Sequence, residues 1–240
     1  MLGHYWEDIG LPLYQLFGGF RNKVPCYVTC AYYREGKDHA ELKDEIQMLV
    51  DQGHQGFKAK VGGLCLAEDL ERMELVREII GPERDLMIDV NRAWDLKTAI
   101  EGARLLEPLK PTWLEEPVRW MDDRRELKIL EHTSIPLSGG ESESTSYGCR
   151  TMIDEKAIQI LQFDCTMFGG FTEGRKMTAL CDLNHVDVAP VFSVLDGHPS
   201  IELVLQARLV LKAQANGPPL LRFLDPMLCS HQSSNLFLAL

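Results

Sequence analysis

Three carboxylates follow three apolar stretches of this chain at equal intervals. Asp89 comes directly after Leu-Met-Ile, Glu115 after Trp-Leu, and Glu141 after a run that ends in Gly-Gly. The step from Asp89 to Glu115 is 26 residues, and so is the step from Glu115 to Glu141. One strand, one helix and two connections need about 25 to 30 residues. We therefore expect each carboxylate to end one of three successive parallel strands, where their oxygens would converge on a hard divalent cation.

Two lysines precede these carboxylates. Lys58 and Lys60 are two residues apart in a β-rich stretch, so on a strand both side chains leave from the same face. Burying both against apolar helices would be costly, which favours the inner face near the mouth of a barrel. There, like charges and a bound cation would lower the pKa of a lysine towards the range of a general base. The alternative is an edge strand whose lysines snorkel to water.

Any one of the three carboxylates also has an ordinary explanation, as a helix N-cap or a satisfied polar residue at a strand end. Three at equal intervals, downstream of paired lysines, favour a metal site. An all-oxygen ligand set favours Mg²⁺, with Mn²⁺ as the alternative, over Zn²⁺.

Strand-like and helical segments alternate along the whole chain. The expected strands are residues 24–30, 56–61, 86–90, 112–115, 135–138, 158–163, 186–189 and 220–223. The expected helices are residues 38–52, 66–80, 95–106, 122–131, 147–153, 172–183 and 201–213. About eight strands that alternate with helices, without a linker or repeat, predict an α/β fold. We expect a TIM-like (β/α)7β barrel rather than an open doubly wound sheet.

The composition excludes several classes of partner. A net charge of −11 without a basic cluster argues against nucleic acid and anionic membranes. No apolar run approaches the roughly 20 residues of a membrane span, and the first 20 residues lack the pattern of a signal peptide. The seven cysteines are scattered and contain no C-x-x-C pair, which predicts reduced thiols and a cytoplasmic protein.

Five motifs follow one another in order. They are a K-x-K strand at residues 56–63, the Asp89 strand at 88–94, Trp-Leu-Glu-Glu-Pro at 113–117, Gly-Gly-Glu at 139–141, and an Asp followed by Gly-Gly-x-Thr within 162–173. In this combination the chain resembles the mandelate racemase/muconate lactonizing branch of the enolase superfamily, and its acid-sugar dehydratases in particular. The resemblance runs from about residue 11 to residue 190 and is weak beyond it.

The resemblance implies that Asp89, Glu115 and Glu141 hold Mg²⁺. It implies further that Lys60 removes the proton α to a substrate carboxylate to give an enediolate. The substrate would be a hydroxy acid or an acid sugar, and the reaction its dehydration or racemisation. Barrels of this branch commonly assemble, so a homo-oligomer is expected.

Three further polar residues take roles from the same resemblance. Lys58 would lie beside the substrate carboxylate, and Asn91 would contact the substrate. Asp164 would orient a histidine on the opposite face of the substrate. That histidine is missing, because Val191 stands where the family has it. His198 and His185 are the nearest replacements, and both are better explained as surface or loop residues.

Two other departures concern the ends of the chain. The eighth strand of the family offers a Glu where this chain has Leu221. The family also has an N-terminal α+β capping domain, and this chain begins where that domain would end. We therefore expect residues 1–20 to be a lead-in segment and residues 21–240 to form the metal-binding barrel. The alternative to an active enzyme is a catalytically silent barrel that binds Mg²⁺ or serves as an oligomer subunit.

Overall fold

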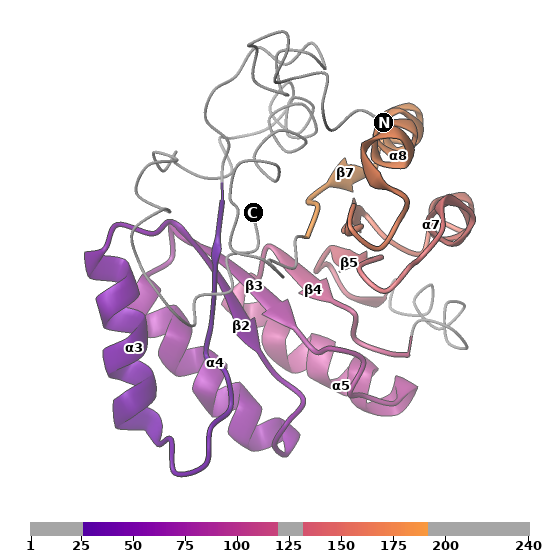
Figure 1. Ribbon diagram of the computed structural model, residues 1–240. Coiled ribbons are helices and arrows are strands. Elements are labelled where there is room, and N and C mark those ends of the chain that lie inside the picture. The colour runs from indigo at the N-terminus through magenta and orange to yellow at the C-terminus, as the bar shows by residue number, and fades with distance from the viewer. Residues whose placement is uncertain (1–25, 120–131, 192–240) are drawn as a thin grey trace, which may run out of the picture.

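The computed structural model describes residues 26–119 and 132–191 (Figure 1). The expected lead-in at residues 1–20, the helices at 122–131 and 201–213, and the eighth strand at 220–223 lie outside the described residues. His198 and Leu221 lie outside them as well.

In the described part of the chain, seven strands form one parallel sheet in which each strand pairs with the next along the chain. They are β1 (Val28–Cys30), β2 (Gly56–Lys60), β3 (Asp85–Asp89), β4 (Trp113–Glu115), β5 (Leu137–Gly139), β6 (Ile160–Leu161) and β7 (Asp187–Val188). All seven expected strands within the described part of the chain are confirmed. The sheet is a parallel α/β half-barrel, and the eighth strand that would close it remains an expectation.

Helices connect these strands and cover the outer face of the sheet. They are α3 (His39–Asp51), α4 (Leu66–Ile80), α5 (Leu96–Leu106), the 3-10 helix η1 (Glu107–Leu109), α7 (Ser146–Asp154) and α8 (Gly170–Asn184). In Figure 1, α3, α4 and α5 lie side by side behind β2, β3 and β4, and α7 and α8 flank the later strands. No described helix is long and apolar enough to cross a membrane.

Local chemistry explains where the helices begin and end. The side chains of Asp38 and Asp95 accept hydrogen bonds from the backbone N–H groups of Glu41 and Thr98, which caps α3 and α5. Gly81, with a φ of 74°, ends α4. The helix α4 has the bounds that its periodicity predicts.

The strand β6 is shorter than expected. Regular pairing covers only Ile160–Leu161, against an expected 158–163. Hydrogen bonds nevertheless continue beyond it, because Gln162 N donates to Gly139 O at 2.8 Å and Val191 N donates to Phe163 O at 3.2 Å. The contact between strands therefore continues beyond the regularly paired residues.

The apolar side chains form two clusters. The larger one lies between the sheet and the helices. The smaller one lies inside the half-barrel, where Tyr27, Met87, Trp113 and Ile160 pack together with Ala189. This interior cluster supports the polar residues near the C-terminal ends of the strands.

Candidate metal and proton-transfer site

The register of the sheet places the expected site residues in one row. Lys60 is paired with Asp89, and Asp89 with Glu115. The 26-residue step from Asp89 to Glu115 therefore corresponds to one step from strand to strand, as expected, whereas Glu115 pairs with Ser138 and not with Glu141. Because alternate residues of a strand face the same side, Lys60, Asp89 and Glu115 all face the interior, and Lys58 lies two residues below Lys60.

Two lysines and two carboxylates of this row form a buried ion-pair network. The Lys58 ammonium lies 2.7 Å from Oε1 of Glu115 and 3.2 Å from Oδ2 of Asp89. The Lys60 ammonium lies 2.5 Å from Oδ2 of Asp89 and donates a hydrogen bond to Oδ1 of Asn91 at 2.8 Å. Asp89 and Glu115 are fully buried. The alternative of an exposed edge strand with snorkelling lysines is wrong, because Lys58 is only 3% exposed.

The second oxygen of Glu115 is held by two residues that the sequence reasoning missed. Trp113 Nε1 donates to Glu115 Oε2 at 3.0 Å, and Gln162 Nε2 donates to the same oxygen at 2.9 Å. Trp113 precedes Glu115 by two residues, and Gln162 precedes Asp164 by two. Strand alternation places Trp113 on the same face as Glu115, and Gln162 on the same face as Asp164, but it does not show that Gln162 contacts Glu115.

Burial and charge pull in opposite directions within this network. Burial alone would lower the pKa of Lys58, but Glu115, Tyr27 and Asp89 outweigh it and raise that pKa well above its usual value. Burial would also raise the pKa of Asp89, but Lys58 and Lys60 lower it overall. Lys58 thus takes its raised pKa from the carboxylates that surround it. The lowered lysine pKa expected beside a bound cation stays a prediction.

Glu141 lies further from this network. It follows β5 by two residues and is half-buried, and its charge helps to raise the pKa values of Glu115 and Glu116. Within residues 26–119 and 132–191, no three His, Cys, Asp or Glu side chains lie close enough together to hold a metal ion. The donor types nevertheless fit Mg²⁺, because Asp89, Glu115 and Glu141 supply carboxylate oxygens at three successive strand ends. Lysine ammonium groups take up the Asp89 and Glu115 oxygens that a cation would bind.

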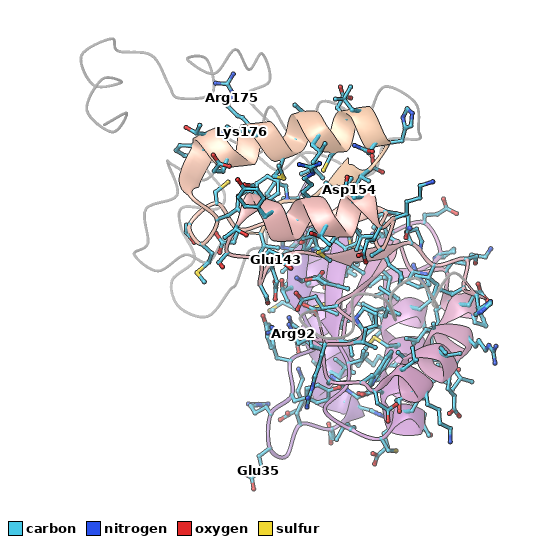
Figure 2. The ribbon with its side chains drawn as sticks, turned by 90° about the vertical axis from the view of Figure 1, so that its right-hand side faces the viewer. Glu35, Arg92, Glu143, Asp154, Arg175 and Lys176 are labelled. Carbon is cyan, nitrogen blue, oxygen red and sulfur yellow. The ribbon has the colours of Figure 1, made fainter. Side chains whose placement is uncertain are left out.

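The backbone is unusual where strands β3 and β4 end. Asn91, Arg92 and Glu116 have φ angles of 47°, 63° and 40°. Such left-handed conformations are costly for residues other than glycine and cluster at functional sites. Arg92 N donates to Glu116 O at 2.8 Å, which joins the two turns. In Figure 2, Glu35, Arg92 and Glu143, which each follow the end of a strand, lie along one side of the molecule.

Glu116 is a second buried acid beside the row. It is 4% exposed, and burial raises its pKa to about 8, with Glu141 adding to the rise and Arg92 opposing it. Arg92 Nε lies 3.2 Å from Glu116 Oε2, but neither carboxylate oxygen accepts a hydrogen bond from the described residues. The ligand set that the family resemblance implies, Asp89, Glu115 and Glu141, leaves this residue out.

Asp164 is not part of the network. Its Oδ1 accepts hydrogen bonds from the backbone N and the Oγ1 of Thr166, at 2.7 and 2.6 Å. Asp164 forms a parallel bridge with Val191, so the valine does stand opposite the aspartate, as the resemblance implies. His185 is exposed and ends α8, before β7 begins, so it lies at the opposite end of that strand.

A comparison with protein families identifies this arrangement. The family model described as "Enolase C-terminal domain-like" matches residues 41–230. The chain belongs to this family. The match includes forty residues beyond position 190, where the resemblance of individual motifs is weak.

Curated relatives in the enolase C-terminal domain-like family include acid-sugar enzymes. Arabinonate dehydratase of Saccharolobus solfataricus is 31% identical over 192 residues, which are 78% of this chain and 52% of that protein. The L-talarate/galactarate dehydratase of Salmonella typhimurium is 32% identical over 77% of this chain and 46% of its own length. The chain thus spans about half the length of these relatives.

A solved structure shows the same fold. L-talarate dehydratase from Polaromonas sp. JS666, complexed with Mg and L-glucarate, is 28% identical and superposes with a TM-score of 0.73. It covers 79% of this chain, and the chain covers 53% of it. The expected membership of the mandelate racemase/muconate lactonizing branch is confirmed by these relatives.

Proposed function

We propose that this barrel carries out Mg²⁺-dependent removal of the proton α to a carboxylate, within the dehydration of a hydroxy acid or acid sugar. The observation that carries the proposal is the buried row in which Lys60, Asp89 and Glu115 pair across three strands. The relatives that act on acid sugars, and the related structure that holds Mg and L-glucarate, support the substrate class.

Asp89, Glu115 and Glu141 would hold the cation, and Mn²⁺ would suit the same oxygens. When bound, the cation supplies polarisation of the substrate carboxylate. Its charge would also compete with the lysines for Asp89 and Glu115. We expect the two ammonium groups to turn from the carboxylates towards the substrate as a result.

Lys60 is the proposed base. Its ammonium is more accessible than that of Lys58, with side-chain exposures of 14% and 3%. Asn91 fixes it from one side through the 2.8 Å hydrogen bond and would help to orient the substrate. Lys58 stays below it, where its charge favours the negative charge that develops on the substrate carboxylate.

In the described part of the chain, Val191 occupies the place on the opposite side of the site where the family has a histidine. Val191 lies beside Asp164, whose Oδ1 is already occupied by Thr166. Racemisation needs a base on one face of the α-carbon and a proton donor on the other, whereas dehydration needs one base and a proton for the departing hydroxyl, which water or His198 would supply. The single lysine side therefore favours dehydration over racemisation.

The first experiment is a thermal melt of the chain with and without millimolar Mg²⁺. A ligand that binds only the folded state raises the stability by about 2.7 kcal/mol at one hundred times its dissociation constant. We expect Mg²⁺ to raise the midpoint of the wild-type chain, and Glu115→Gln to abolish that rise. Glu116→Gln is the matched control, because it removes the adjacent buried carboxylate that the ligand pattern leaves out.

The outcomes separate the proposals. A rise that Glu115→Gln removes and Glu116→Gln keeps supports the ligand set, and acid sugars are then tested for uptake of solvent deuterium at the α-carbon. A rise that Glu116→Gln removes instead means that the ligand set is wrong. A cooperative melt that ignores Mg²⁺ favours the second candidate, a catalytically silent barrel, for which Val191 beside Asp164 is the specific observation.

A further inference from the structure

A buried arginine outside the site joins the ends of two strands. Arg72 lies on α4 and is 7% exposed. Its Nη1 donates to the carbonyl of Lys60 at 3.1 Å, and its Nη2 to the carbonyl of Ala31 at 2.6 Å. Regular pairing of β1 with β2 stops at Cys30 and Ala59. The guanidinium therefore links the two strands at the point where their own ladder ends.

Two neighbours fix the position of this guanidinium. Asp69 is 1% exposed, and its Oδ1 accepts hydrogen bonds from Arg72 Nη1 at 2.8 Å and from Tyr33 Oη at 2.5 Å. The ring of Tyr33 lies over the guanidinium, 4.2 Å from its carbon. Charge-assisted hydrogen bonds of this kind are about twice as strong as neutral ones. We call Tyr33, Asp69 and Arg72 the clamp.

The clamp also holds the loop that follows Lys60. The backbone N–H of Gly62 donates to Asp69 Oδ2 at 2.7 Å, and that of Gly63 donates to Tyr33 Oη at 3.0 Å. The Lys60 carbonyl and the Gly62 amide are thus both bound to α4, and the Gly63 amide is bound to Tyr33. Between Lys60 and Gly62, Val61 N donates to Asp89 O at 2.9 Å, which continues the hydrogen bonding between β2 and β3.

We propose that Arg72 is a positioning residue that, through the clamp, sets where the Lys60 side chain lies. The inference rests on the proposed function, because Lys60 is its proton acceptor. Lys60 reaches Asp89 and Asn91 from a backbone whose carbonyl Arg72 holds. A misplacement of about 1 Å at a reacting group can cost on the order of 100-fold in rate.

The same helix contains a matched control. Arg77, also on α4, donates to the carbonyls of Gly81 and Arg84 at 3.0 and 2.7 Å, and to those of Leu109 and Lys110 at 2.9 and 3.2 Å. It therefore holds backbone carbonyls as Arg72 does, but near the beginnings of β3 and β4, away from Lys60. If weakening any contact between an arginine of α4 and backbone carbonyls is enough to disturb Lys60, the Arg72 and Arg77 variants will show the same effect.

The test measures the position of Lys60 directly. The chain is labelled with ε-¹³C-lysine, and the Lys60 resonance is assigned with Lys60→Arg. The Lys60 ammonium lies 5.6 Å from the centre of the Tyr32 ring, so the ring displaces that resonance from the position of an exposed lysine. We expect Arg72→Lys to move it towards the exposed-lysine position and Arg77→Lys to leave it in place.

Each outcome decides the proposal. A Lys60 resonance that is equally unchanged, or equally moved, in Arg72→Lys and Arg77→Lys overturns it. If Arg72→Lys loses its cooperative melt, Tyr33→Phe replaces it, because this variant removes only the hydroxyl that joins Asp69 to Gly63.

Turnover gives the second readout and separates this inference from the proposed function. On an acid-sugar substrate we expect Arg72→Lys to lower kcat on the order of 10- to 100-fold with little change in KM, and Arg77→Lys to leave both unchanged. A moved resonance with an unchanged kcat reduces the clamp to a purely structural role and overturns the inference. If the wild-type chain itself shows no turnover, the proposed function fails, and the resonance comparison alone decides whether the clamp positions Lys60.

Discussion

Inside the half-barrel, near the C-terminal ends of β2, β3 and β4, buried charged side chains pair with one another, as Lys58 does with Glu115. Outside it, near the N-terminal ends of β3 and β4, Arg77 binds four backbone carbonyls instead. Side chains that pair with one another can exchange partners when a ligand arrives, whereas the surrounding fold holds backbone carbonyls in place. In β/α barrels this division separates chemistry from stability.

The largest expected effect comes from removing one buried charge. Lys58→Met leaves Glu115 without its ion-pair partner, and breaking a buried pair in this way costs about 3 to 5 kcal/mol. Arg77→Met, at the other end, exposes carbonyls rather than a charge and should cost about 1 to 3 kcal/mol. Urea unfolding of both variants measures the difference. Equal losses would mean that buried charge is not what distinguishes the two ends.

A pair of glycines gives the next largest difference. Gly62 follows β2 with a φ of 96°, and an added Cβ would lie 2.7 Å from Ala93 Cβ. Gly81 ends α4 with a φ of 74°, but no atom lies within 4 Å of its added Cβ. Backbone strain costs about 1 to 2 kcal/mol at either site, and the steric overlap adds about 1 to 3 kcal/mol at Gly62 alone. We expect Gly62→Ala to have the lower thermal midpoint, and a reversed order would contradict this account.

Two adjacent residues test hydrogen bonds to acids at the two ends. Trp113→Phe removes a buried donor to Glu115, which should cost about 1 to 3 kcal/mol. Thr112→Val removes the 3.2 Å hydrogen bond to Asp85 and should cost about 0.5 to 1 kcal/mol. Chemical denaturation of both variants measures the two losses. The comparison fails if the threonine variant is the less stable of the two.

The smallest expected effect is a difference in the sign of pH dependence. Burial raises the pKa of Asp85, although Thr112 and Arg77 oppose the rise. Hydrogen bonds from Thr98, first from its backbone, lower the pKa of Asp95. Asp85 therefore makes the fold less stable as the pH rises above the pKa that this residue has in the unfolded chain. Asp95 makes the fold less stable as the pH falls below the pKa that it has in the unfolded chain.

Asp85→Asn and Asp95→Asn isolate these two contributions. We expect the stability of wild type relative to Asp85→Asn to decrease from acid towards neutral pH. Relative to Asp95→Asn it should increase over the same range. Unfolding free energies measured at several pH values check both slopes, and two slopes of the same sign would contradict the assignment.

Much of this half-barrel follows from local patterns. Apolar periodicity predicted the bounds of α4 and placed the starts of α3 and α5 within one residue of their observed first residues, His39 and Leu96. The spacing of Asp89 and Glu115 predicted their neighbouring places because one β-α-β unit has a narrow range of lengths. Such features depend on residues close together in the chain.

The contacts that hold the site were less predictable. In the sequence, Asp69 and Arg72 are two charges on a helix with many, and only the fold shows that they are buried. Gln162 reaches Glu115 across 47 residues, so no local rule selects it. The state of Lys58 also depended on its partners, because the sequence does not say whether a cation or a lysine neutralises Glu115.

The row of charges has a consequence for how the strands align during folding. On each strand of the row an apolar neighbour, Ala59, Ile88 or Leu114, faces the helices. A slip by one residue would exchange the two faces, bringing lysine, aspartate or glutamate under the helices and apolar groups into the polar interior. Misaligned sheets are therefore penalised before any ligand is present. The charges proposed for catalysis therefore also help to fix the register of the strands in the sheet.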